Sequence, residues 1–196
     1  HVCHVSCKES LTVIRDYKNH GANITCEVTP HHLLLCEDDI HEDDGKFKMN
    51  PPLRTREDKQ ALIDGLLDGT IDMIATDHAP HSEEEKSKGL QGSSMGIVGL
   101  ETAFPMIYTH LVRPNIISLK MCLELMSSRC AEVFGLDGGA IEDGSLANLA
   151  IFDLNHSTRI DPDKFKSKGH CTPFAYQEAY GECVMTFYCG KCVYRR

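Results

Sequence analysis

The sequence predicts an α/β protein with a parallel sheet, and three observations lead to this fold class. Apolar runs short enough for buried strands occupy residues 1–5 and 71–77, and a run with alternating polarity occupies 23–29. Segments with apolar residues at helical spacing lie between these runs. Nearly continuous apolar strands that alternate with helices are typical of parallel sheets covered by helices.

Capping signals define the first two long helices. Ser6 with Glu9 three residues later is a capping-box pattern, and apolar residues at helical spacing then continue to a stop at Gly21. Thr55 predicts the cap of a second helix, which closes at Gly69. Each helix therefore lies between two of the predicted strands.

The pattern changes in the last third of the chain. Three more helices are predicted at about 99–112, after Ser118 to residue 126, and at 129–135. Beyond them, 146–154 reads as a strand and 182–194 as two strands. The carboxyl end is thus mainly β.

We expect two structural regions, residues 1–135 with α/β character and residues 136–196 as a mainly β layer. The cysteine pair in CGKC (189–192) has two interpretations. A zinc knuckle would need a second ligand pair at suitable spacing, and none is nearby. A hairpin turn at Gly190–Lys191 is therefore favoured.

Composition excludes several classes of function. The 196 residues are 41% hydrophobic and 25% charged, which is ordinary for a soluble globular protein. The net charge of −9 without basic clusters argues against nucleic acid or an anionic membrane as partner. No run approaches the roughly 20 apolar residues of a membrane span. We expect the ten cysteines to be free, buried thiols in a reducing cytoplasm.

Three polar side chains are predicted at the carboxyl ends of strands or in loops beside them, namely His4, Asn50 and Asp77. In an α/β barrel these ends point into a common mouth where catalysis occurs. A carboxylate there is costly unless it meets a cation, and a neutral imidazole is the commonest metal partner. His4 and Asp77 could thus complete a divalent-metal site, with Asp77 also acting as a base. The polar segment 81–94 that follows is expected to be a flexible loop, and we favour a lid.

Each of these residues also has a structural interpretation. A lone histidine on a strand, such as His4, is more often a core residue than a ligand, and Asp77 could simply cap a turn. His31–His32 directly after Pro30 reads as the first turn of a helix with a structural role. Residue patterns alone leave an α/β protein with a candidate metal site.

Taken together, the motifs resemble one family, the dihydroorotases of the amidohydrolase superfamily. In order, the motifs are HVCHVS, CEVTPHHLLL, FKMNPPLR, DGTIDMIATDHAPHSEEEK, GIVGLETAFP and the final GKCVY. The resemblance implies the carboxyl-terminal part of a (β/α)8 TIM barrel and strands of a small β-sandwich. It also implies a binuclear Zn²⁺ centre in the complete enzyme and a cytoplasmic, homo-oligomeric protein.

The resemblance assigns roles residue by residue. It makes His4 and Asp77 metal ligands, with Asp77 also the catalytic proton shuttle. Asn50, His81 and the backbone at Met95–Gly96 match substrate contacts, whereas His78 is left with a structural role. The implied reaction is zinc-dependent, reversible hydrolysis of the cyclic amide L-dihydroorotate to N-carbamoyl-L-aspartate, in de novo pyrimidine synthesis.

The sequence departs from the family in what it lacks. The HxH pair of the first barrel strand, the bridging carboxylate or carboxylated lysine of the fourth and the fifth-strand histidine are absent. With no initiator methionine, we interpret the chain as the carboxyl-terminal half of a dihydroorotase, inactive alone. The alternatives are a hydantoinase-like cyclic amidase, a non-catalytic subunit that scaffolds aspartate transcarbamoylase, and a stand-alone α/β binding module.

Overall fold

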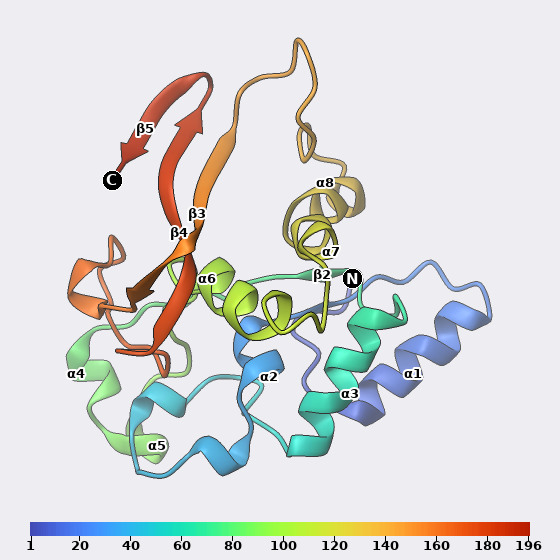
Figure 1. Ribbon diagram of the computed structural model, residues 1–196. Coiled ribbons are helices and arrows are strands. Elements are labelled where there is room, and N and C mark those ends of the chain that lie inside the picture. The colour runs from blue at the N-terminus through green and yellow to red at the C-terminus, as the bar shows by residue number, and fades with distance from the viewer. The chain divides into compact units, whose positions relative to one another are not determined.

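Figure 1 shows the computed structural model, which describes residues 1–196. By packing, the chain forms two units, each described here by itself. Unit 1 comprises residues 1–103 and 161–176, and unit 2 comprises 104–160 and 177–196. None of the helices combines the length and apolar character that a membrane span requires.

Parallel pairing organises unit 1. Val2 bridges Cys26, and β1 (Glu27–Val28) pairs with β2 (Met73–Ile74) in parallel. His78 forms a further parallel bridge to Ile97. The predicted α/β class is therefore confirmed, although the regular strands are much shorter than the predicted runs.

The strands are short because the backbone leaves the extended region near their ends. His4 has φ 38° and Asp77 has φ 47°, so the backbone of both residues is in the left-handed region. A left-handed residue cannot continue a strand ladder. The buried side chains behind these ends, including Val5, Cys26, Val28 and Met73, form part of the core of unit 1.

The start of α1 (Lys8–Asn19) differs from the prediction. Its N-cap is Cys7, which makes no side-chain cap, so the predicted capping box at Ser6 and Glu9 is wrong. Instead, the backbone N–H of Lys8 donates to Oδ1 of Asp58 at 2.9 Å. A carboxylate distant in sequence thus satisfies a helix-terminal donor that the local motif was expected to satisfy.

The same carboxylate completes the cap of α3 (Arg56–Leu67). Thr55 is its N-cap, as predicted, and forms a capping box with Asp58. The hydroxyl and the N–H of Thr55 donate to Oδ2 of Asp58 at 2.6 and 3.2 Å. One aspartate therefore orders the starts of two helices that lie side by side.

Short helices fill the rest of unit 1. Thr29 caps α2 (Pro30–Leu34), which confirms the helical turn predicted at Pro30. The segment 81–94 is not the flexible loop predicted, because it contains α4 and α5 and buries Lys86. The remaining short elements are α4 (Glu83–Lys86), α5 (Gly89–Gly92), η1 (Glu37–Asp39), η2 (Gly45–Phe47) and η5 (Pro162–Lys164).

Helices of unit 2 are more continuous than predicted. The two helices expected at 118–126 and 129–135 form one run that Ser118 caps and that ends at the left-handed Gly135. A π-helical stretch joins the α-helical segments, and a second follows the helix that begins at residue 103. The elements are α6 (Ala103–Ile107), η3 (Tyr108–Val112), α7 (Leu119–Leu123), η4 (Glu124–Ser128) and α8 (Arg129–Phe134).

An antiparallel sheet completes unit 2 (Figure 1, orange to red). Its order is β3 (Leu149–Arg159), β4 (Glu178–Tyr188) and β5 (Lys191–Arg195). The predicted hairpin is present, but its turn is Cys189–Gly190 rather than Gly190–Lys191. Both turn residues have positive φ, 50° and 76°, which matches the twist of paired strands.

All ten cysteines are free thiols, but only Cys26, Cys36 and Cys122 are buried. The prediction that the cysteines are buried is therefore wrong for the other seven.

The division of the chain by packing does not follow a boundary at residue 135. The assignment of 1–135 and 136–196 to separate structural regions therefore stays a prediction.

Candidate active site at the strand ends

His4 and Asp77 mark the ends of two strand segments of unit 1. Both are left-handed, a conformation that costs energy for residues other than glycine and that concentrates at functional sites. The two residues predicted as metal ligands thus share the same unusual backbone conformation, one in each segment.

An electrostatic interaction couples His4 and Asp77. Burial raises the pKa of the Asp77 carboxyl, the imidazole of His4 opposes this rise, and the carboxylate of Glu27 adds to it. No hydrogen bond joins His4 and Asp77, whose side chains are half-buried. Burial therefore outweighs the favourable effect of His4 on the Asp77 carboxylate.

A buried, unpartnered nitrogen lies near this pair. His31 is 1% exposed, and its Nε2 has no hydrogen-bond partner. Burial lowers its pKa well below the ordinary value, and the neighbouring His32 and His4 lower it further. A buried polar atom without a partner is rare in proteins and requires an explanation.

These features fit a divalent cation. An imidazole and a carboxylate are common ligands of Zn²⁺ and related ions, and a cation would stabilise the partly buried carboxylate of Asp77. The chain supplies His4 and Asp77 for this purpose. Further ligands would have to come from outside these residues.

Three predicted substrate-binding groups also lie together. His81 Nε2 donates to the carbonyl of Met95 at 2.9 Å. Gly96 has φ 129°, and a Cβ there would lie 2.5 Å from the Cβ of Ala79 and 3.3 Å from Nε2 of His81. Only glycine fits this close approach, so His81 and the 95–96 backbone form one surface.

Lys86 holds this surface in place, and residue patterns did not identify it. The side chain is 5% exposed, and Nζ donates to the carbonyls of Lys48, Ser94 and Gly96 at 3.0, 2.8 and 2.7 Å. The Lys48 carbonyl also accepts the N–H of Gly96 at 3.0 Å. In the charged run EEEK the sequence suggests a solvent-exposed lysine, and its burial is seen only in the folded structure.

Asn50 is exposed, and no hydrogen bond joins it to the other predicted site residues. Its segment is held through the next residue, because His32 Nε2 donates to the carbonyl of Pro51 at 3.0 Å. The other ring nitrogen, Nδ1, then accepts from the hydroxyl of Thr29 at 2.7 Å. Burial lowers the pKa of His32 to about 4, so the ring is neutral.

His78 has backbone partners, in keeping with the structural role expected for it. Its Nδ1 accepts the N–H groups of Gly99 and Leu100 at 3.1 and 3.2 Å. Its Nε2 donates to Ser167 Oγ at 3.3 Å, and Ser167 donates to Glu101 at 2.8 Å. Burial opposes ionisation of Glu101, but the bonds from Ser167 hold the pKa of that carboxyl below its usual value.

Comparison with known proteins identifies the family. The model of the amidohydrolase family matches residues 1–193. The chain belongs to this family. Dihydroorotases of Geobacillus sp. (strain WCH70) and Bacillus cytotoxicus are 56% and 54% identical over the whole chain, which spans 46% of the length of each relative.

Solved structures show the same fold. L-hydantoinase from Arthrobacter aurescens matches 99% of the chain with a TM-score of 0.92 at 32% identity, and the chain covers 44% of it. Dihydropyrimidinase from Brevibacillus agri matches 99% with a TM-score of 0.91 at 25% identity, also over 44% of its length. The chain thus spans less than half of these relatives.

Proposed function

We propose that this chain carries a portion of the active site of a dihydroorotase. The reaction is the reversible hydrolysis of L-dihydroorotate to N-carbamoyl-L-aspartate, a step in pyrimidine synthesis. The identity of 56% to a curated dihydroorotase over all 196 residues carries the proposal. The similar hydantoinase structures are 24–32% identical, so they support the amidase class more than the substrate.

The proposed architecture accounts for the arrangement of polar groups. The parallel segments that end at His4 and Asp77 would be strands of a (β/α)8 barrel, within residues 1–135. The antiparallel strands within residues 136–196 would contribute to a small β-sandwich. In a barrel, side chains at the carboxyl ends of strands share one mouth, where substrate binds.

Asp77 is the proposed general base and acid. Its carboxylate takes a proton from the attacking water and delivers the proton to the departing ring nitrogen. Burial raises its pKa, which makes the ionised carboxylate a stronger base. His4 and Asp77 would hold zinc, which when bound would polarise the amide carbonyl and acidify the water.

The substrate would lie against the surface of His81, Met95 and Gly96. The side-chain amide of Asn50 can donate to a carboxylate, and His81 can do so when its Nε2–H leaves the carbonyl of Met95, while the 95–96 backbone can position the ring. Lys86 does not contact the substrate in this scheme. It holds the backbone on which the contacts depend.

Two protein ligands are too few for a stable zinc centre. We therefore propose that the 196 residues alone do not hydrolyse dihydroorotate. A homo-oligomeric, cytoplasmic enzyme is proposed from the family resemblance.

A chimera tests this function directly. In the Geobacillus dihydroorotase, this chain replaces the segment that it matches, and the purified chimera is assayed on dihydroorotate and on hydantoin. We expect hydrolysis of dihydroorotate by the chimera and none by the 196 residues alone. A folded chimera that prefers hydantoin would indicate a hydantoinase, and a folded but inactive one would indicate a non-catalytic relative.

A further inference from the structure

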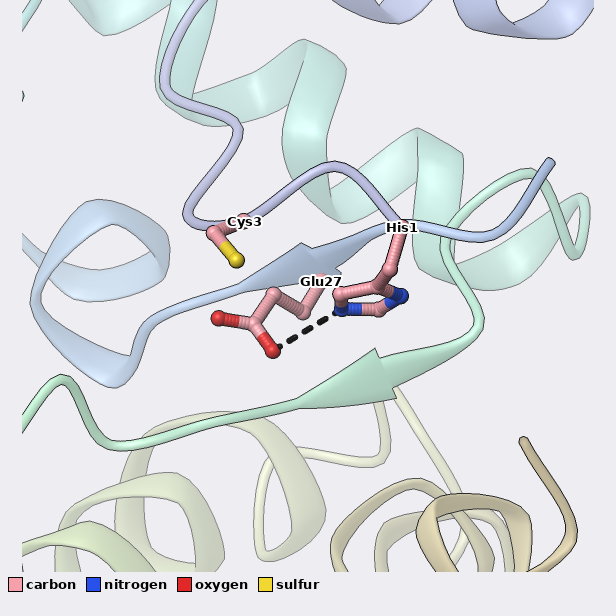
Figure 2. Close-up of side chains that lie close together, drawn as sticks. All are labelled: His1, Cys3 and Glu27. Atoms are coloured by element: carbon pink, nitrogen blue, oxygen red, sulfur yellow. Dashed lines mark hydrogen bonds and ion pairs between the residues drawn. The ribbon is translucent and has the colours of Figure 1, made fainter. Parts of the chain in front are cut away.

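A second group of potential metal ligands lies where residues 1–3 pair with residues 25–27, at the start of β1. It consists of His1, Cys3 and Glu27, whose ligand atoms all lie within 4.8 Å of one another. Figure 2 shows the three side chains turned toward one another. The family motifs assign no role to any of them.

Strand geometry explains why these residues meet. Side chains alternate between the two faces of a strand, so His1 and Cys3 share one face. The parallel bridge of Val2 to Cys26 places residue 27 of β1 beside this face. Val2 and Cys26 point to the other side, where Cys26 is buried.

The imidazole of His1 is held on both sides. Nδ1 lies 2.7 Å from Oγ1 of Thr25, and Nε2 lies 3.1 Å from Oε2 of Glu27. The side chains of His1 and Glu27 are only 16% and 12% exposed. Metal-binding histidines commonly donate their second ring nitrogen to such an oxygen, which fixes the tautomer and leaves the other nitrogen for the metal.

The charge of the group also suits a cation. A thiolate at Cys3 and the carboxylate of Glu27 would give two negative charges with one neutral imidazole. A divalent ion would neutralise the set.

We propose that His1, Cys3 and Glu27 bind a divalent ion of the Zn²⁺ type, with Thr25 orienting the imidazole. Nitrogen, sulfur and oxygen ligands together select borderline ions such as Zn²⁺ and Co²⁺ over Mg²⁺ and Ca²⁺. Binding replaces the His1–Glu27 hydrogen bond and releases the Cys3 thiol proton to solvent. Three protein ligands leave one tetrahedral position for water.

Cobalt provides the test, because thiolate coordination gives a charge-transfer absorption band that imidazole and carboxylate ligands do not. Co²⁺ is titrated into the 196-residue chain and, in parallel, into the chimera. Both carry Cys189→Ser and Cys192→Ser, which remove two exposed thiols of the hairpin. We expect the band to appear and Zn²⁺ to abolish it by displacement.

Single variants then locate the site. Cys3→Ser should abolish the band, whereas the control Cys7→Ser should leave it unchanged. Thr25→Val should weaken Co²⁺ binding by about 10- to 100-fold, as is typical for loss of an outer hydrogen-bond partner. Glu27→Gln should keep the band and weaken binding further, since it removes a ligand.

Circular dichroism confirms that each variant is folded. A folded protein that shows no band, or a band that survives Cys3→Ser, would overturn the proposal. In that case His1 and Glu27 would form only the hydrogen-bonded pair seen in the structure.

Discussion

At Lys86 a buried cation donates to three backbone carbonyls, whereas His4 and Asp77 interact electrostatically without a hydrogen bond between them. Both clusters lie in unit 1, and each contains partly or fully buried groups that can carry charge. The Lys86 cluster has donors matched to acceptors. The strand ends have a carboxylate whose ionisation burial disfavours, left-handed backbone and, nearby at His31, an unpartnered nitrogen.

This difference distinguishes a cluster with a structural role from one with a proposed catalytic role. A fully satisfied buried network makes the structure rigid, and an incompletely satisfied one costs stability unless a ligand completes it. We therefore interpret the Lys86 cluster as the support of the substrate surface. We infer that the strand ends form the site where a cation and substrate bind.

The largest expected effect is a loss of folding stability at acidic pH. The pKa of His32 falls from 6.5 to about 4 on folding because the ring is buried. Below pH 6.5 the unfolded chain therefore binds a proton that the folded chain does not, and stability is lost as the pH falls to about 4. The loss is about 3 kcal/mol, and His31 adds to it in the same direction.

Urea unfolding at pH 7 and at pH 4.5 measures this loss. His32→Gln should reduce the pH dependence, while the exposed His20→Gln should retain it. An unchanged dependence in His32→Gln would show that this ring is not the titrating group.

The second-largest effect is expected when the buried ammonium group of Lys86 is removed. Lys86→Met leaves the carbonyls of Ser94 and Gly96 without their donor and should lower the free energy of unfolding by about 2 to 3 kcal/mol. Limited proteolysis should then cleave within 81–96 faster. The exposed Lys88→Met is the control and should change stability by less than about 0.5 kcal/mol. Equal effects of the two substitutions would remove the basis for treating Lys86 as the support.

Asp77→Asn should act in the opposite direction. It removes a charge that burial disfavours, and asparagine tolerates the left-handed backbone. We expect the metal-free chain to gain about 1 kcal/mol, as is common when a functional residue is replaced. Destabilisation in thermal unfolding would mean that Asp77 has a structural partner.

The smallest effect concerns Cys189, which is left-handed like Asp77 but lies in a hairpin turn. If its strain serves no function, Cys189→Asn should stabilise the protein by about 0.5 kcal/mol and leave Co²⁺ binding at Cys3 unchanged. Thermal unfolding and the cobalt titration check both expectations. A loss of stability would show that the thiol itself stabilises the turn.

Sequence patterns predicted those features that depend on neighbouring residues. The cap at Thr55, the helical turn at Pro30 and the hairpin near Gly190 were all accessible in this way. The motifs also singled out His4 and Asp77, because strand ends can be placed from apolar runs.

Features that depend on distant residues were missed. The cap of α1 comes from Asp58, 50 residues along the chain from Lys8. The carbonyls that accept hydrogen bonds from Lys86 lie up to 38 residues away in the sequence. No local pattern contains that information. The cluster of His1, Cys3 and Glu27 likewise requires the register between two strands.

The central claim is that Asp77 performs the proton transfer of dihydroorotate hydrolysis. The most direct test is the kcat/KM of the chimera on dihydroorotate, with and without Asp77→Asn, and with the exposed Asp16→Asn as control. We predict a loss of at least about 100-fold for Asp77→Asn and none for Asp16→Asn. A folded Asp77→Asn chimera with unchanged kcat/KM would contradict the account.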